Sequence, residues 1–472
     1  MSVARARAAS AADLAGETAT PARFDAAWLG SRLRDTLGAL RGRRLCVAYS
    51  GGVDSGALLA ALAALRSRER FALRALHVDH RIQPQSAQWA RAARARARRL
   101  RVPCEVIELT IGCARGESLE AAARAARYQA LAARLKRGEL LLTAHHQEDQ
   151  LETVLLALLR GSGVRGLAAM RAVTPWAGTL LLRPLLPVSR AQLEQFVRER
   201  GLDWSEDPSN ADERFDRNYL RRAVLPLIRR RWPAAATTVS RSAAHLAEAR
   251  ALLEQLASAG LQQARDGATL RVSVLRRLPL PQRRNALRQW IAERGLPAAD
   301  QRRMREICGP MLDARDDALP RVSWRGAELR RHADRLFAFD AAESPRPVAV
   351  EQWDWRAQPW LRLADGGALG LVRDRHGDVR LAALPRLLRV RHRRGGERLQ
   401  GARGRMALKD LLQAQGLAPW ERAAVPLIMH AGRIIAVADL WLDRTYGCQD
   451  EPAADRGRFR WRRGGVKIDD CD

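Results

Sequence analysis

The part of the sequence that most clearly suggests chemistry is a short loop with two consecutive glycines. It reads Ser50-Gly51-Gly52-Val53-Asp54-Ser55. Consecutive glycines let the backbone turn tightly, so that its N–H groups point at one anion. The two serine hydroxyls can donate to phosphate oxygens, whereas Asp54 can serve a phosphate only through a cation such as Mg²⁺. The loop therefore predicts a phosphate site, and it is not a Walker loop because no Gly-Lys-Ser/Thr follows.

The segments on either side of the loop support this interpretation. Residues 45–49 form a short apolar run that is typical of a buried strand, and Leu58, Leu62 and Leu65 follow at helical spacing. A helix that begins at the loop adds a partial positive charge beside a bound anion. The alternative is a plain strand-to-helix turn, which requires the fixed residues of the loop to coincide by chance.

Two carboxylates and four histidines are further candidates for chemistry. Asp149 and Glu152 lie three residues apart near the start of a predicted helix, so they share one helix face. They can hold Mg²⁺, an ammonium group, or both; the alternative is an acidic first turn that only favours the helix dipole. We expect the histidines to orient phosphate or base, or to pack, rather than to bind zinc. They are His77, His80, His145 and His146.

Several arginines are candidates for binding phosphate groups. Arg124 and Arg127 are three residues apart on a predicted helix and can reach the phosphates of a nucleotide or of a nucleic acid. Arg160, beside a glycine, can close over a nucleotide. A basic cluster suited to nucleic-acid phosphates consists of Arg217, Arg221 and Arg222. The alternatives are solvated helix charges and, for Arg160, a plain helix C-cap.

The loop resembles the PP-loop of the N-type ATP pyrophosphatases, which adenylate a carbonyl or carboxyl oxygen, release pyrophosphate and let a nucleophile displace AMP. Further motifs narrow the resemblance. They are HVDH at 77–80, LEAAARAARY at 119–128, TAHHQEDQLET at 143–153, LLRGSG at 158–163, RPLL at 183–186, DPSN at 207–210, RNYLR at 217–221, APWER at 418–422 and VPLI at 425–428. Together they resemble the tRNA(Ile)-lysidine synthetases, over most of the chain from 44 to 461.

That family joins L-lysine to the 2-carbon of the wobble cytidine in the CAU anticodon of isoleucine tRNA, through an adenylated cytidine. The resemblance therefore implies ATP, Mg²⁺, L-lysine and this tRNA as ligands. It implies catalytic roles for Asp54, Asp149 and Glu152, with Mg²⁺ on Asp54 and Asp149. ATP would contact residues 50–55 together with His77 and Arg127. The substrates would contact Arg124, Arg160, Arg217 and Arg222.

The sequence departs from the family's pattern at two positions. Arg81 stands where a glycine commonly follows the HxxH motif, which allows a different loop shape there. Asp410 follows Lys409 where two adjacent lysines are usual, and this weakens an expected contact with tRNA. Arg403 and Arg405 can supply the missing positive charge.

Two other functions fit parts of the sequence. A tRNA 2-thiolation enzyme shares the loop and a polyanionic partner, but such enzymes deliver sulfur through paired cysteines or a cluster. The six cysteines of this chain are scattered, and none forms a C-x-x-C pair. A noncatalytic RNA-binding protein with a decayed nucleotide fold is the second alternative. The intact Asp54, Asp149 and Glu152 argue against it.

Composition indicates the partner and the compartment. The formal net charge is +30, with 82 basic residues in 472, and such a surface attracts polyanions, above all nucleic acid. Scattered cysteines fit a reducing cytosol. No apolar run approaches the roughly 18 residues of a membrane span, and no secretory signal begins the chain. We therefore expect a cytoplasmic protein with no membrane segment; the sequence leaves a homodimer open.

The order of the predicted elements indicates the fold. Strands at 45–49, 72–78, 104–109 and 140–144 alternate with helices, which predicts an α/β fold with a doubly wound parallel sheet. A mainly helical domain and a small α+β C-terminal domain with a hairpin at 425–438 are expected to follow. The predicted boundaries are 1–40 for an N-terminal leader and helix, 41–228 for the PP-loop domain, 229–342 for a mainly helical tRNA-binding domain, 343–384 for a connection and 385–465 for a C-terminal tRNA-recognition domain.

Overall fold

The computed structural model describes residues 20–81, 85–109, 119–205, 212–340, 351–363, 367–401, 404–448 and 452–462. Contacts along the chain divide it into two units, Met1–Gln255 and Leu256–Asp472. Most of the predicted N-terminal leader and the motif at 207–210 lie outside the described residues. No helix in the described ranges is both long enough and apolar enough to cross a membrane.

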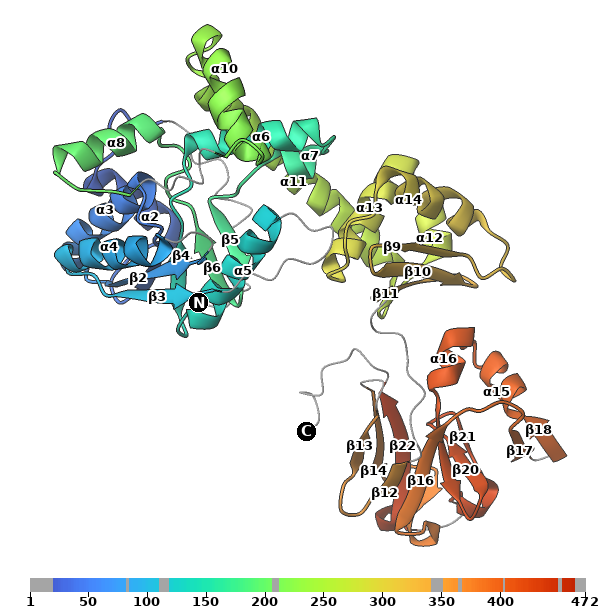
Figure 1. Ribbon diagram of the computed structural model, residues 1–472. Helices are drawn as coiled ribbons and strands as arrows, with labels where there is room; N and C mark the ends of the chain where they lie inside the picture. Colours follow the sequence, from blue (N-terminus) through green and yellow to red (C-terminus); the bar gives the residue numbers. More distant parts are fainter. Residues whose placement is uncertain are drawn as a thin grey trace. The chain divides into compact units, whose positions relative to one another are not determined.

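A six-stranded sheet forms the centre of the first unit, in the order β3-β2-β1-β4-β6-β5 (Figure 1). Every neighbouring pair is parallel except β5 with β6. Because β1 has β2 on one side and β4 on the other, the strand order reverses at β1. Open α/β sheets bind their ligands at such a switch point. The strands are β1 (Arg44–Ala48), β2 (Ala72–Asp79), β3 (Cys104–Glu108), β4 (Glu139–Leu142), β5 (Val173–Trp176) and β6 (Thr179–Leu182).

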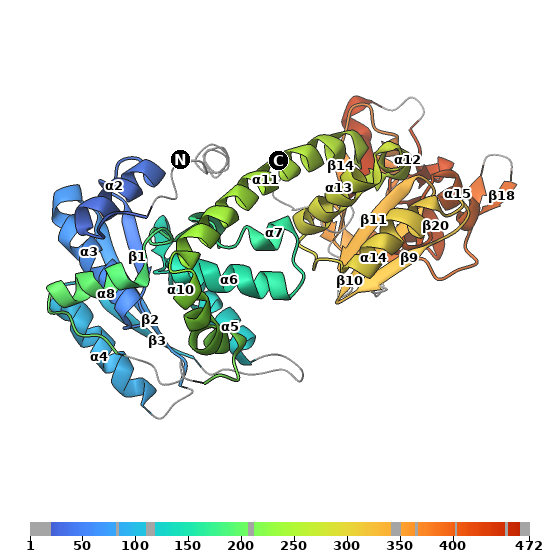
Figure 2. The same cartoon turned by 90° about the horizontal axis from the view of Figure 1, so that it is seen from above.

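Helices cover both faces of this sheet (Figure 2). Along β1, Leu45 and Val47 pack into a core formed with α2, α3, α4 and α8, whereas Cys46 packs on the opposite face against Leu131 of α5. The predicted doubly wound arrangement is therefore confirmed. The helices are α2 (Ala26–Leu37), α3 (Val53–Glu69), α4 (Ser86–Arg99), α5 (Leu119–Arg134), α6 (Gln147–Leu159), α7 (Val164–Leu167) and α8 (Arg190–Glu199).

The chain that follows the sheet packs back onto α6. Leu225 joins Leu151 of α6 in a small apolar core with Ala235 and Ala236. This contact brings the arginines of the RNYLR motif close to the carboxylates of α6. The elements involved are α9 (Asp216–Tyr219), a π-helical turn (Leu220–Val224), α10 (Leu225–Arg231) and α11 (Ala235–Ala264).

The first part of the second unit contains a five-stranded antiparallel sheet in the order β7-β8-β11-β10-β9. The sequence predicts a mainly helical domain at 229–342; helices are present, but this sheet is not foreseen. Arg331 occupies an inward position of β10, where it donates to the carbonyls of Leu312 and Ala314, so the apolar alternation of a strand is broken. The elements are β7 (Arg265–Asp266), β8 (Thr269–Arg271), α12 (Val272–Arg277), α13 (Leu280–Glu293), α14 (Gln301–Glu306), a π-helical turn (Ile307–Met311), β9 (Arg321–Trp324), β10 (Ala327–His332) and β11 (Arg335–Asp340).

Two sheets, β12-β16-β19-β20-β21 and β13-β14-β22-β15, enclose a second core in this unit that includes Trp353, Leu388 and Phe459. The predicted hairpin is confirmed as β19 and β20. The expectation of a connection at 343–384 is wrong for its described residues, because they form β12–β15. The elements are β12 (Glu351–Asp354), β13 (Trp360–Arg362), β14 (Ala368–Arg373), β15 (Val379–Arg380), β16 (Leu387–His392), β17 (Arg398–Gly401), β18 (Gly404–Ala407), α15 (Leu408–Ala414), α16 (Pro419–Ala424), β19 (Pro426–His430), β20 (Arg433–Val437), β21 (Trp441–Leu442) and β22 (Arg456–Arg462).

Candidate active site

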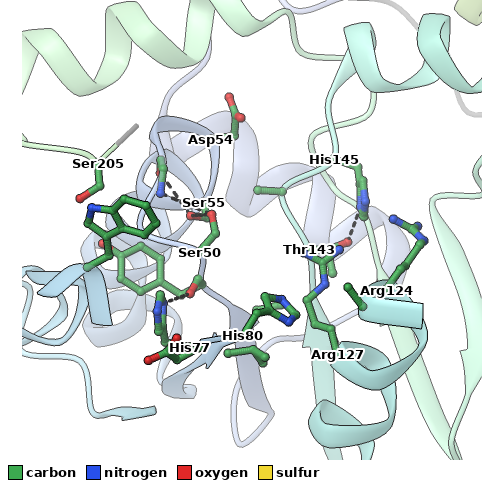
Figure 3. Close-up of a pocket in the computed structure, with 18 of the residues that line it drawn as sticks. Ser50, Asp54, Ser55, His77, His80, Arg124, Arg127, Thr143, His145 and Ser205 are labelled. Atoms are coloured by element: carbon green, nitrogen blue, oxygen red, sulfur yellow. Dashed lines mark hydrogen bonds between the residues drawn. The ribbon is translucent and has the colours of Figure 1, made fainter. Parts of the chain in front are cut away.

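A cavity of about 880 Å³ lies at the carboxyl ends of β1, β2 and β4, where the sheet topology predicts a ligand. Its walls come from the glycine loop after β1, the HVDH motif after β2, helix α5, the segment after β4 and residues within 204–205 and 212–221. Figure 3 shows the loop serines facing an opposite wall that carries Arg124 and Arg127. Site residues predicted from the sequence that line this cavity are Ser50, Gly52, Val53, Asp54, Ser55, His77, Arg124, Arg127, Asp149 and Arg217.

The glycine loop has the geometry of an anion site. Gly51 has φ of 86°, a conformation that favours glycine. The hydroxyls of Ser50 and Ser55 are 3.0 Å apart, and the N–H of Gly52 donates to the Ser50 hydroxyl at 3.3 Å. Gly52 is also the N-cap of α3 and offers no capping side chain, so the first N–H groups of this helix are available to a ligand. The predicted strand–loop–helix arrangement is thus confirmed.

Two carboxylates from different helices converge beside this loop. Asp54 Oδ2 lies 3.6 Å and Asp149 Oδ2 lies 3.5 Å from the same atom, Nε2 of His146. The other Asp54 oxygen, Oδ1, is buried and has no hydrogen-bond partner. An orphaned carboxylate oxygen next to a second carboxylate fits Mg²⁺, which takes one or two carboxylates and fills its other positions with phosphate oxygens and water. The described residues contain no group of three His, Cys, Asp or Glu side chains suited to a metal.

His146 neutralises this acidic cluster. It is buried, which by itself opposes its positive charge, but the carboxylates of Asp149, Asp54 and Glu148 raise its pKa to about 10. The Nδ1 atom of His146 lies 3.0 Å from Glu148. The imidazolium therefore holds the carboxylates of α3 and α6 together.

The adjacent His145 has the opposite character. Burial, aided by arginines such as Arg183 and opposed by Asp149, lowers its pKa to about 3. Its Nδ1 atom lies 2.9 Å from the hydroxyl of Thr143, and both side chains line the cavity (Figure 3). His145 therefore presents a neutral imidazole to a ligand.

The wall opposite the loop is positively charged. Arg124 and Arg127 of α5 lie over the ring of Tyr128, with guanidinium carbons 5.3 and 5.8 Å from its centroid. Burial, together with Arg124 and Arg217 and against the influence of Tyr128, lowers the pKa of Arg127. An anion bound between these three arginines would relieve their mutual repulsion, which fits the phosphate role predicted for them.

Glu152 does not line the cavity. It is 1% exposed and accepts hydrogen bonds from Arg221 at 2.7 and 2.9 Å, while Arg217 Nε lies 3.3 Å away. Arg217 and Arg221 line the cavity and contact this predicted catalytic carboxylate, which does not line the cavity itself. Arg221, which was part of the predicted basic cluster, does line the cavity, and its guanidinium lies 3.6 Å from Asp149.

Two other predicted substrate-binding arginines also lie away from the cavity. Arg160 is exposed and pairs with Asp216 at 2.9 Å, and Arg222 pairs with Glu213 at 3.3 Å.

Residues that sequence patterns did not single out complete the cavity wall. They include Tyr49, Trp204, Ser205 and Phe215. Ser205 had one available signal, since it lies shortly before the DPSN motif. Arg81, expected to allow a different loop shape, has φ of 49°, so it adopts the left-handed conformation that a glycine there would take easily.

The sequence of this chain matches models of known domain families and the sequences of several related proteins. A PP-loop domain model matches residues 29–228, a TilS substrate binding domain model matches 270–337 and a TilS substrate C-terminal domain model matches 388–461. A relative from Alkalilimnicola ehrlichii, named tRNA(Ile)-lysidine synthase, is 44% identical over 84% of this chain and 89% of its own length. Relatives of the same name from Pseudomonas aeruginosa and Methylococcus capsulatus are 42% and 39% identical, each over 84% of this chain and over 89% and 91% of their own lengths. The chain therefore belongs to the tRNA(Ile)-lysidine synthase family.

Proposed function

We propose that this protein is an ATP-dependent, AMP-forming ligase that attaches L-lysine to the 2-carbon of the wobble cytidine in the CAU anticodon of isoleucine tRNA. The convergence of a phosphate loop, the carboxylates of Asp54 and Asp149 and an arginine wall in one cavity supports the proposal most strongly. Membership of the tRNA(Ile)-lysidine synthase family indicates that isoleucine tRNA and lysine are the substrates. The net charge of +30 fits a tRNA partner.

The cavity offers one group for each requirement of the reaction. The loop amides and the hydroxyls of Ser50 and Ser55 bind the ATP phosphates. Asp54 and Asp149 would hold Mg²⁺, which neutralises phosphate charge and thereby makes pyrophosphate a better leaving group. Arg124, Arg127 and Arg217 stabilise the phosphate that stays with the adenosine. Adenylation of the cytidine carbonyl oxygen then makes carbon 2 electrophilic.

The second half-reaction forms a carbon–nitrogen bond and breaks the bond between carbon 2 and the oxygen of AMP. The lysine ε-amine must arrive as a cation and lose a proton before or during attack. Because Glu152 is engaged by two arginines, Asp149 is the α6 carboxylate that can attract the ammonium group from the cavity. The proton passes to a nearby base or to water, and His145, whose pKa is lowered to about 3, offers a neutral imidazole beside the reacting groups.

The proposed activity also determines the partners and the compartment that we infer. Isoleucine tRNA bearing CAU and L-lysine are the substrates, and the protein works in the cytoplasm. A homodimer remains a prediction from the sequence.

Omission of single substrates tests the proposal. The full-length protein is incubated with ATP, Mg²⁺, lysine and unmodified isoleucine tRNA, and AMP and pyrophosphate are quantified as each component is left out. We expect equal amounts of AMP and pyrophosphate, and neither product without tRNA. Pyrophosphate release that continues without tRNA would contradict the proposal, and a requirement for a sulfur donor in place of lysine would favour the thiolation alternative. No release under any condition would favour the noncatalytic RNA-binding protein.

A further inference from the structure

One arginine of α4 reaches the phosphate loop from outside the cavity. Arg96 Nη1 donates to the hydroxyl of Ser205 at 2.8 Å and to the carbonyl of Gly51 at 3.3 Å. The backbone N–H of Ser205 donates to the same Gly51 carbonyl at 3.0 Å. Three segments, namely the loop, α4 and residues 202–205, are therefore joined at a single carbonyl oxygen.

This carbonyl belongs to the peptide group that also carries the N–H of Gly52. In a planar trans peptide the C=O and N–H point in opposite directions. When Arg96 and Ser205 hold the carbonyl of Gly51 on their side, the N–H of Gly52 must face the other side, where it meets the Ser50 hydroxyl and the cavity. The positively charged guanidinium that donates to this carbonyl oxygen also polarises the peptide group, which makes the N–H of Gly52 a stronger donor.

The packing around Gly51 fixes the loop against the same helix. A Cβ atom on Gly51 would lie 3.3 Å from the Cβ of Ala93, which is one turn before Arg96 on α4. The φ of 86° favours glycine here, and a side chain at this position would also require Ala93 to shift slightly. The loop is therefore seated on α4 by shape at Ala93 and by hydrogen bonding at Arg96.

We propose that Arg96 is a positioning residue for ATP: by holding the Gly51 carbonyl, it keeps the Gly52 N–H turned toward the phosphate site and ties the loop to the wall at Ser205. The inference rests on ATP as the ligand of the loop. It concerns a residue that does not line the cavity and that lies outside every motif of the sequence.

A neighbouring ion pair provides a control that distinguishes positioning of the loop from general packing of α4. Arg99, also on α4, pairs with Asp203 at 3.0 Å, and their side chains are 72% and 67% exposed. This pair joins the same helix to the same segment but does not touch the loop. Arg99→Met is therefore a matched control for Arg96→Met, since both remove one link between α4 and residues 202–205.

The experiment measures KM for ATP, kcat for pyrophosphate release, tRNA affinity and melting temperature in Arg96→Met, Arg96→Lys, Arg99→Met and Ser205→Ala. We expect Arg96→Met to raise KM for ATP about tenfold, because a charged donor to the loop is lost, and to leave tRNA affinity within about twofold. Arg96→Lys should recover part of this loss, since one ammonium group can reach one acceptor but does not reproduce the guanidinium fork. Arg99→Met should leave KM for ATP unchanged.

The proposal is overturned if Arg96→Met and Arg99→Met change KM for ATP equally, or if Arg96→Met lowers only the melting temperature. Should Arg96→Met fail to fold, Arg96→Lys decides, because it keeps the positive charge but loses the guanidinium fork. In that variant a raised KM for ATP at unchanged melting temperature supports the proposal, and an unchanged KM contradicts it. Ser205→Ala keeps the bond of Arg96 to the Gly51 carbonyl, so it should raise KM for ATP less than Arg96→Met does. Stabilisation of the wild-type protein by ATP and Mg²⁺ is recorded in parallel; its absence would count against the proposed function, independently of Arg96.

Discussion

Arg221 donates two hydrogen bonds to Glu152, from Nε at 2.7 Å and from Nη2 at 2.9 Å, and so holds both carboxylate oxygens of a residue that is 1% exposed. The same guanidinium lies 3.6 Å from Asp149. Two carboxylates of one helix face thus have different surroundings. Asp149 faces the cavity, whereas Glu152 anchors the arginine that stands beside it.

Glu152→Gln should therefore act through Arg221. The variant removes the buried charge that accepts both hydrogen bonds of the half-buried Arg221, which costs on the order of 2 kcal/mol in stability, and lets Arg221 move relative to Asp149. We expect lower kcat, a lower melting temperature and an effect in Glu152→Gln/Arg221→Met smaller than the sum of the single effects. If Glu152 instead contacts lysine, the single variant should raise KM for lysine at unchanged melting temperature, with effects additive to those of Arg221→Met.

Asp54→Asn should remove activity while the protein stays folded. The variant keeps the shape of the side chain but loses the charge that faces Mg²⁺ and the phosphates, so pyrophosphate release should fall by about 100-fold or more. Activity is measured across a Mg²⁺ titration, with Asp203→Asn, an exposed carboxylate of the same unit, as control. Turnover at the wild-type level in Asp54→Asn would refute the role of this carboxylate.

Binding of tRNA should depend steeply on salt. Each phosphate neutralised by the protein contributes about −0.7 to −0.9 to the slope of log K against log salt, and the net charge of +30 provides many such contacts. Filter binding or fluorescence anisotropy between low and physiological salt gives the slope. A flat dependence would show that the positive surface is not used for tRNA.

The exposed pair Lys409 and Asp410 on α15 tests the tRNA role of the C-terminal domain. Asp410→Lys should tighten tRNA binding and make the salt slope steeper by about 0.7 to 0.9, as one added phosphate contact would, without changing KM for ATP. Asp35→Lys on α2, an exposed site in the first unit, makes the same change of charge elsewhere. Equal gains in both variants would mean that only the overall charge matters.

The sheet of the first unit contains a buried ion pair with a predictable pH dependence. Burial alone would raise the pKa of Glu139, but hydrogen bonds from Arg74 and from the N–H of Lys136 outweigh it and lower the pKa. The unfolded chain then binds more protons than the folded one, so this stabilisation is complete above the ordinary Glu pKa of about 4.3 and is lost as pH falls below it. Unfolding measured from pH 7 to pH 3 should show a shallower acidic decline in Glu139→Gln. An identical decline in both proteins would contradict this assignment.

The first unit was predictable because its signals are local. Buried strands read as apolar runs, as at residues 45–49, most of which form β1 (Arg44–Ala48). The strands at 351–380 gave no such signal, since β14 pairs with β22, and residues such as Leu369 and Trp461 are far apart in the chain. Their pairing is a tertiary effect, and local patterns do not contain it.

The same limit explains what was predicted of the site. Two carboxylates, Asp54 and Asp149, follow the ends of strands, and Arg124 and Arg127 share one helix face. Their positions in the sequence were therefore sufficient to predict that they line one site, and all four line the cavity. Spacing could not separate Asp149 from Glu152, because both belong to one helix face and only the partner Arg221 distinguishes them. Arg96 and Ser205 meet across a separation of 109 residues, which no motif records.

The nucleophile is the central claim, and its transfer can be followed directly. The protein is incubated with ATP, Mg²⁺, labelled L-lysine and unmodified isoleucine tRNA bearing CAU, and the tRNA is digested and analysed nucleoside by nucleoside. We predict one label per tRNA, at the wobble cytidine, with one AMP and one pyrophosphate released for each lysine attached. The absence of lysine from the tRNA, together with a thiolated base when a sulfur donor is supplied, would contradict the account.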